Sequence, residues 1–369
     1  MCKPATFRML AWSTCAGLLL ALSAVAADRP RSQPSRKQLV VWLKVLEPLP
    51  KVHYSWPLPP WMFNPRDPLF YEYVRITHAI TLHGEVTTPQ RIEAAVIVCQ
   101  RVNATGPSIP ASLAIKYSPW HHVFSKDLPP TDESRTHRGE LELLGQRLES
   151  IAQWVETARL RHKSDVAVSA ILFDSERFHV KLGDAAWNAA LTAKYDAAYD
   201  LARKFFPNVR VEWYNRGAVQ RAARGNGWET SSYFTLAERG DAFACSLYTL
   251  PEIGYTREIF RRTVQQAQAH GVAQVTPWIA LASGYRRQLN TPFEWTFDWD
   301  YDLIYSWLIG REVNHPWFGK PEARERFAPW GAAKVVVLYP RPFSEKSPAW
   351  GKHFVAYVRG AHMIKELPK

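Results

Sequence analysis

Cysteine is scarce in this sequence of 369 residues, which contains only four. Two of them, Cys2 and Cys15, lie in the N-terminal segment, so Cys99 and Cys245 remain for the rest of the chain. Two cysteines cannot build a disulfide framework, and no Cys-x-x-Cys pair of the zinc-binding kind occurs. We therefore interpret Cys99, on an expected helix, and Cys245, in an expected strand, as packing residues.

Several signatures of nucleotide and nucleic-acid chemistry are also missing. The sequence has no P-loop and no glycine-rich turn after its first apolar segment, and helix-turn-helix and zinc-finger patterns are absent. A Gly-x-Ser-x-Gly nucleophile elbow does not occur, which argues against an α/β-hydrolase. We expect no nucleic acid partner and no cofactor.

Metal-binding patterns are weak. His121 and His122 are adjacent, but no further histidine or carboxylate follows them at the spacing of a zinc site. Asp298, Asp300 and Asp302 alternate along the chain, yet they lack the glycine and glutamate of a calcium-binding EF-hand loop. Capping of a following helix is the better interpretation of these aspartates, so no metal is expected.

Only one long apolar run occurs, at residues 9–25. Lys3 and Arg8 precede it and small residues follow it, which predicts a secretory signal peptide over residues 1–26, with an uncleaved anchor as the alternative. Residues 27–37 are polar and basic, and we interpret them as a flexible leader. We expect the mature protein to be secreted or periplasmic, without membrane contact once the signal is removed.

Tryptophan is abundant, and the charge is positive. The chain has 16 Trp, which is about three times an ordinary share for a globular protein. Such an excess indicates an aromatic core or a surface that stacks on ring-shaped ligands. The formal net charge is +12, but basic residues are scattered in short clusters. Binding of a polyanion is therefore the weaker hypothesis.

Strand-like and helix-like segments alternate along the rest of the chain. We expect strands at 39–46, 75–82, 112–117, 166–173, 209–214, 242–248, 272–281 and 334–339. We expect helices at 88–102, where Thr88 is the N-cap and Pro89 the first helical residue, and at 138–162, 184–205, 256–270, 301–313 and 351–365. Eight apolar strands, mostly followed by helices, predict an α/β fold with a single (β/α)8 TIM barrel over residues 38–369. An open doubly wound α/β sheet is the alternative.

Two carboxylates follow the fourth expected strand. Asp174 and Glu176 share one face of that strand, because side chains alternate between its two faces. In a barrel, catalytic residues lie at the C-terminal ends of the strands. Neighbouring carboxylates hinder each other's ionisation, which keeps one protonated as a general acid. The alternative is an acidic turn with Arg177 as counter-ion.

Further candidates lie at the ends of other strands. Glu212 could be a third catalytic carboxylate or the partner of Arg216 or Lys116 in an ion pair. Tyr248, after the sixth strand, could donate a hydrogen bond in the transition state or close the barrel. The aromatic and imidazole side chains expected to bind substrate are Trp120, His121, Trp213, Tyr214, Trp278 and Tyr339.

The segment Asp174-Ser175-Glu176 resembles the Asp-x-Glu end of the glycoside hydrolase family 18 motif, found in chitinases and endo-β-N-acetylglucosaminidases. The resemblance implies that Glu176 protonates the glycosidic oxygen. It also implies that Asp174 positions the acetamido group of the substrate, and that Tyr248 matches a family tyrosine. The chain departs from the family at Ser169 and Leu172, where the motif has aspartates. It also departs at Thr249, which replaces an aspartate, and at Tyr339, which replaces a tryptophan.

These departures leave two alternatives beside the hydrolase with Glu176 as general acid. One is a retaining glycosidase with Asp174 as nucleophile and Glu212 as acid/base, which resembles α-amylase-type barrels. The other is a non-catalytic carbohydrate-binding barrel. In each case the expected partner is a polysaccharide or oligosaccharide.

Overall fold

The fold is known from a computed structural model, which describes residues 35–45, 52–55, 58, 62–117, 136–174, 185–213, 239–246, 261, 263–265, 267–269, 271–272, 275–280 and 336–339. The helices are α2 (Arg36–Lys44), α3 (Pro68–Thr77), α4 (Pro89–Asn103), α5 (Thr136–His162) and α6 (Ala185–Phe205). The strands are β1 (Val52–Ser55), β2 (Ala79–His83), β3 (Ser112–Tyr117), β4 (Val168–Phe173), β5 (Arg210–Trp213), β6 (Ala242–Ser246), β7 (Val275–Ala280) and β8 (Val336–Tyr339).

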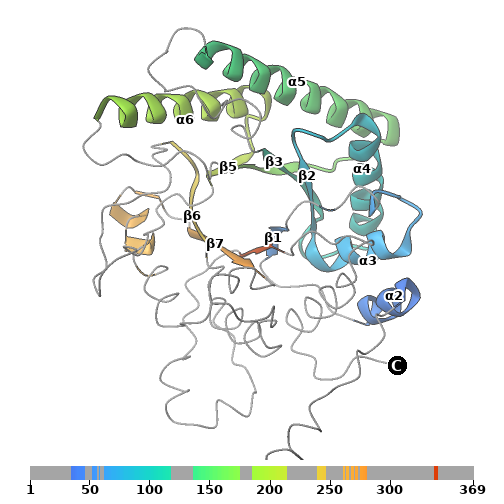
Figure 1. Cartoon of the computed structure of the whole chain (residues 1–369). Helices are drawn as coiled ribbons and strands as arrows, with labels where there is room; N and C mark the ends of the chain where they lie inside the picture. The colour runs from blue at the N-terminus through green and yellow to red at the C-terminus, as the bar shows by residue number, and fades with distance from the viewer. Residues whose placement is uncertain are drawn as a thin grey trace, which may run out of the picture.

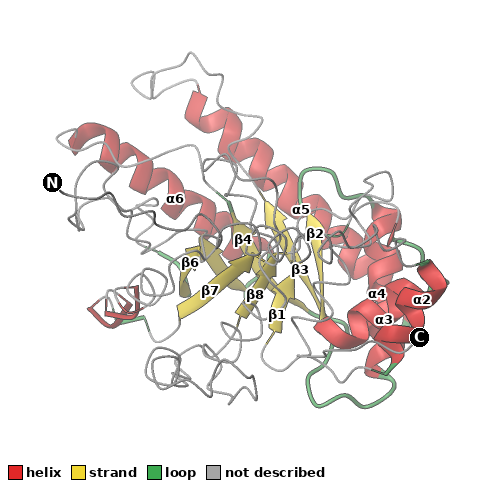
Figure 2. Ribbon diagram, turned by 60° about the horizontal axis from the view of Figure 1, so that its bottom comes forward, coloured by secondary structure: helices red, strands yellow, loops and turns green. Residues whose placement is uncertain are grey.

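The strands form one parallel sheet in the order β1-β8-β7-β6-β5-β4-β3-β2. From β2 to β8 each strand pairs with its neighbours in sequence, and β1 pairs with β8. Cα atoms of β1 and β2 approach within 8 Å, and the Leu58 N–H, just after β1, donates to the Thr81 carbonyl of β2. The sheet is therefore a (β/α)8 barrel, because a doubly wound sheet reverses its strand order. Figures 1 and 2 show α3, α4, α5 and α6 outside the strands.

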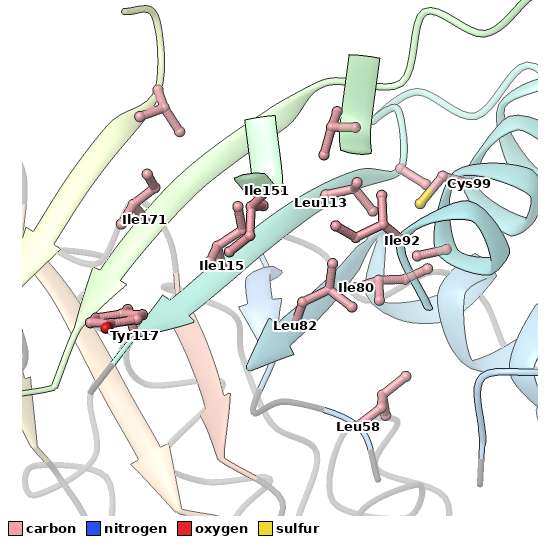
Figure 3. Close-up of a cluster of buried hydrophobic side chains, with 14 of the residues drawn as sticks. Leu58, Ile80, Leu82, Ile92, Cys99, Leu113, Ile115, Tyr117, Ile151 and Ile171 are labelled. Carbon is pink, nitrogen blue, oxygen red and sulfur yellow. The ribbon is translucent and has the colours of Figure 1, made fainter. Parts of the chain in front are cut away.

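Alternation of side chains along the strands separates the core from the barrel interior. Ile80, Ile115 and Ile171 belong to the hydrophobic layer between strands and helices. Figure 3 shows this layer, in which Ile92 of α4 and Ile151 of α5 lie beside strand residues. Residues of opposite parity point into the barrel, and they include Thr81, Ala114, Lys116, Ala170, Leu172 and Glu212.

The first predicted strand, 39–46, is wrong, because this segment forms helix α2. Ser35 caps the helix in a capping box, in which its hydroxyl accepts from the Gln38 N–H and the Gln38 side chain accepts from the Ser35 N–H. Leu39 and Leu43 are buried one helical turn apart. The apolar run is thus one face of a helix that begins within the predicted leader 27–37, and the first strand of the barrel is β1.

The second predicted strand, 75–82, includes the end of a helix that the prediction missed. Helix α3 starts at Asp67, whose carboxylate accepts from the Leu69 N–H, followed by Pro68 as the first helical residue. It ends at His78, which adopts the left-handed conformation with φ of 56°. Strand β2 therefore starts at residue 79 and extends one residue beyond the predicted end.

The middle of the chain follows the predictions closely. The predicted strand 112–117 coincides with β3, and the helix capped by Thr88 is α4. The predicted segments 138–162 and 184–205 are α5 and α6, and the last five predicted strands contain β4 to β8. Residues 261, 263–265 and 267–269 are helical, within the predicted helix 256–270. The predicted helices at 301–313 and 351–365 lie outside the described residues.

The predicted signal peptide, 1–26, also lies outside the residues that the structure describes. Within the described part of the chain, no helix has the length and apolar character needed to cross a membrane.

Candidate functional site

The carboxylate predicted at the end of the fourth strand lies at the C-terminal end of the barrel. The Asp174 N–H donates to the Tyr117 carbonyl at 3.0 Å, so the backbone pairing of β3 and β4 continues to this residue. The side chain of Asp174 is only 5% exposed, and its Oδ2 lies 2.6 Å from Nζ of Lys116. Lys116 is itself 3% exposed, so the two residues form a buried ion pair.

Strand register explains why Lys116 reaches Asp174. Lys116 pairs in register with Leu172, which places Asp174 two residues closer to the C-terminal end. Both side chains point into the barrel, and the long lysine side chain spans the difference in level. The second carboxylate oxygen, Oδ1, is buried and has no hydrogen-bond partner among the described residues.

Two residues at the end of β2 complete what we call the β2–β4 cluster, which consists of His83, Glu85, Lys116 and Asp174. His83 pairs in register with Lys116, and its side chain is 37% exposed. Burial, followed by the charges of Lys116 and Arg91, lowers the pKa of His83 to about 4. His83 is therefore a neutral imidazole near neutral pH. Its Nδ1 lies 4.0 Å from Oε2 of Glu85, which is too long for a hydrogen bond.

The backbone that carries His83 and Glu85 is fixed from two sides. The Gly84 N–H donates to the Lys116 carbonyl at 2.7 Å. A Cβ atom on Gly84 would lie 2.6 Å from Cδ2 of Tyr117, so glycine permits this close approach. From α5, Arg147 donates to the carbonyls of Gly84 and Thr87, at 2.6 Å each. An outer helix thus holds the turn between β2 and α4.

Glu212 lies deeper in the barrel, in register with Leu172 rather than with Asp174. It is 0% exposed, accepts a hydrogen bond from the Thr276 hydroxyl at 3.1 Å and lies 2.6 Å from Nε of Arg210. Burial raises the pKa of Glu212 to about 8, although the hydrogen bond from Thr276 opposes the shift. Of the two expected ion-pair partners of Glu212, Lys116 lies 2.6 Å from Asp174, and Arg216 lies outside the described residues; the cation beside Glu212 is Arg210.

Trp213 was expected to bind substrate, and the structure places it in the hydrophobic core instead. It is 0% exposed, and its indole stacks on Phe173, with centroids 4.5 Å apart. Tyr195 of α6 packs edge-on against it at 4.7 Å, and Nε1 donates to the Arg239 carbonyl. Trp213 has opposite parity to Glu212 on β5, so its side chain points towards the helices.

The remaining predicted site residues fall into two groups. Trp278 lies in β7 and Tyr339 in β8, but the structure does not describe their side chains. The residues that lie outside the described part of the chain are Glu176, Tyr248, Trp120, His121 and Tyr214.

Sequence reasoning did not assign three residues of the β2–β4 cluster to the site, His83, Glu85 and Lys116, although it named Lys116 as a possible partner of Glu212. Lys116 carried a usable signal, because it is the one charged residue in an otherwise apolar strand. His83 was missed because the predicted strand ended one residue too early. No group of three or more histidine, cysteine, aspartate or glutamate side chains within the described ranges could hold a metal ion.

Neither a protein-family model nor a curated protein matches this chain. Among solved structures, bee venom hyaluronidase is similar with 11% identity and a TM-score of 0.39, over 85% of this chain and 100% of that one. A Podospora anserina GH26-CBM35 β-(1,4)-mannanase has 10% identity and a TM-score of 0.38, over 88% of this chain and 64% of that one. The endo-1,4-β-D-mannanase of Thermotoga petrophila RKU-1 has 9% identity and a TM-score of 0.40, over 84% and 99%. At these scores the similarities carry no conclusion about function.

Proposed function

We propose that this protein is a glycoside hydrolase that acts on a polysaccharide or oligosaccharide at the C-terminal end of its barrel. Glu176 is the general acid and Asp174 its partner. One observation carries the proposal: Oδ2 of Asp174 is held by Lys116, while the buried Oδ1 has no hydrogen-bond partner among the described residues.

A buried carboxylate oxygen without a donor is costly, so its presence calls for a group that donates to it. The alternation of a strand predicts that Glu176, two residues after Asp174, lies on the same side of the chain. A protonated Glu176 or the amide of an N-acetylated sugar would supply the missing donor. Both fit the chemistry that the resemblance to family 18 implies, in which the substrate's own acetamido group is the nucleophile.

The arrangement of Glu212 does not favour the alternative retaining mechanism. An acid/base residue must come within hydrogen-bond reach of the glycosidic oxygen. Glu212 is enclosed at the level of Leu172, and its carboxylate is already engaged by Thr276 and Arg210. Asp174 and Glu212 therefore lie at different depths of the barrel rather than facing each other across one substrate.

A second candidate function is a non-catalytic carbohydrate-binding barrel. The ion pair between Lys116 and Asp174 favours it. A carboxylate whose charge is balanced by a lysine can accept hydrogen bonds from sugar hydroxyls without taking part in a reaction. The two candidates differ in whether the unsubstituted protein hydrolyses the glycan that it binds.

The test uses the purified protein and β-linked tetrasaccharides of N-acetylglucosamine, glucose and mannose. We expect hydrolysis of at least one of them, and we expect Glu176→Gln to abolish turnover while thermal unfolding stays unchanged. Glu149→Gln makes the same chemical change at an exposed position of α5 and serves as the matched control. Undiminished hydrolysis by the Glu176→Gln variant would refute the assignment. Binding without hydrolysis by the unsubstituted protein would select the non-catalytic barrel.

A further inference from the structure

We propose that His83 is a glycan-binding residue, whose imidazole hydrogen-bonds a sugar hydroxyl beside Asp174 at the C-terminal end of the barrel. The inference rests on the proposed function and adds the residue that orients the sugar ring. It follows from where His83 lies, what its side chain can donate and accept, and how firmly its backbone is held.

His83 is the solvent-accessible member of a buried group. It shares the parity of Thr81, so it continues the interior face of β2, and it lies in register with Lys116. Lys116 and Asp174 are 3% and 5% exposed, whereas the side chain of His83 is 37% exposed. A ligand beside Asp174 can therefore contact the imidazole of His83 from solvent without displacing the buried ion pair.

The chemistry of the imidazole suits a hydroxyl group. A neutral histidine has one donor and one acceptor nitrogen, which match the acceptor and donor capacity of a hydroxyl. Burial and the nearby charges of Lys116 and Arg91 favour this neutral form, and the opposing charge of Asp174 is the weakest of these influences. A cationic histidine would only donate, and it would suit a carboxylate better than a hydroxyl.

The backbone at His83 is held in place before any ligand arrives. The His83 carbonyl accepts from the Thr87 N–H at 2.9 Å, and the next residue, Gly84, donates to the Lys116 carbonyl. Arg147 of helix α5 donates hydrogen bonds to the carbonyls of Gly84 and Thr87. A binding residue on such a fixed turn loses little conformational entropy when the ligand binds, which favours affinity.

Binding is measured in the Glu176→Gln background, so that turnover does not consume the ligand, with the three tetrasaccharides named above. His83→Phe keeps a flat ring without nitrogen, and we expect it to weaken binding about three- to tenfold, the loss of one hydrogen bond. His83→Gln keeps a donor and an acceptor, and we expect it to retain most of the affinity. His162→Gln, at the end of α5 and paired with Glu93, is the matched control and should bind as tightly as the reference.

Each outcome decides the inference. Equal affinity of His83→Phe and the reference overturns it, as does an equal loss in His83→Gln and His83→Phe, which would indicate a role in packing. If the protein hydrolyses a tetrasaccharide but the His83 substitutions leave its affinity unchanged, only this inference is overturned. If the His83 substitutions weaken binding but no tetrasaccharide is hydrolysed, only the proposed activity is overturned. If none of the three sugars binds, both are overturned. Thermal unfolding of each variant shows whether it is folded.

Discussion

Lys116 on β3 and Asp174 after β4 form a buried ion pair, with Nζ 2.6 Å from Oδ2. The pair joins two neighbouring strands at the end of the barrel where catalytic residues of this fold lie. Removing two charges from water is costly, and their attraction offsets that cost only while both remain. The pair therefore couples the stability of this end of the barrel to the geometry of the proposed site.

Replacing Lys116 with methionine should destabilise the protein strongly. The substitution leaves Asp174 buried without its cation, and we expect the free energy of unfolding to fall by about 3–5 kcal/mol in urea denaturation. The double variant Lys116→Met/Asp174→Asn should recover part of this loss, because it removes both charges. Additive effects of the two single substitutions, within about 0.5 kcal/mol, would show that the residues do not interact.

The low pKa of His83 predicts a pH dependence of stability. The group titrates at about 4 in the folded chain against 6.5 for an unperturbed histidine. Between these values the unfolded chain binds more protons, so the contribution of His83 is fully present above pH 6.5 and is lost as the pH falls to 4. The free energy of unfolding, measured across this range, should fall less steeply in His83→Gln. If the free energy of unfolding changed with pH in the same way in the unsubstituted protein and in His83→Gln, the prediction would be contradicted.

Substitution of Gly84 by alanine should destabilise the turn beside the site. Its Cβ would lie 2.6 Å from Cδ2 of Tyr117, and we expect a loss of about 1–3 kcal/mol from overpacking. Gly145→Ala in α5 is the matched control, since its Cβ would only touch the tip of Leu201 at 3.4 Å. Alanine favours a helix over glycine, so the control should gain about 0.5–1 kcal/mol. If Gly84→Ala and Gly145→Ala shifted the midpoint of thermal unfolding in the same direction, the close contact of Gly84 with Tyr117 would be contradicted.

Trp213→Ala should act on stability rather than on sugar recognition. Loss of a fully buried indole costs about 3–5 kcal/mol, whereas Leu160→Ala, at a position 71% exposed, should change the free energy of unfolding by less than about 0.5 kcal/mol. Under conditions where the Trp213 variant is folded, its affinity for the tetrasaccharides should equal that of the unsubstituted protein. If Trp213→Ala stayed as stable as the unsubstituted protein but lost sugar binding, Trp213 would be a substrate-binding residue after all.

The sequence predicted those parts of the fold whose signals are local. Thr88 and Pro89 define the start of α4, and alternation along 166–173 places Asp174 on the interior face. By the same alternation, the side chains of Trp213 and Glu212 lie on opposite faces of their strand. The buried position of the Trp213 indole could therefore have been predicted from the sequence. Residues 39–46 were misread because a short apolar run fits both a strand and one face of a helix.

By itself, the sequence determined the repeated strand–helix pattern, most element bounds from α4 onwards and the inward direction of Asp174, because caps and alternation act within a few residues. Only the tertiary structure decided which cation meets that carboxylate and which helix holds the turn after β2. Lys116 reaches Asp174 because of the register between β3 and β4, and Arg147 reaches Gly84 and Thr87 because α5 packs beside α4, the helix that follows this turn. These partners lie about 60 residues apart in the chain, and their meeting depends on strand register and closure of the barrel, which no local pattern specifies.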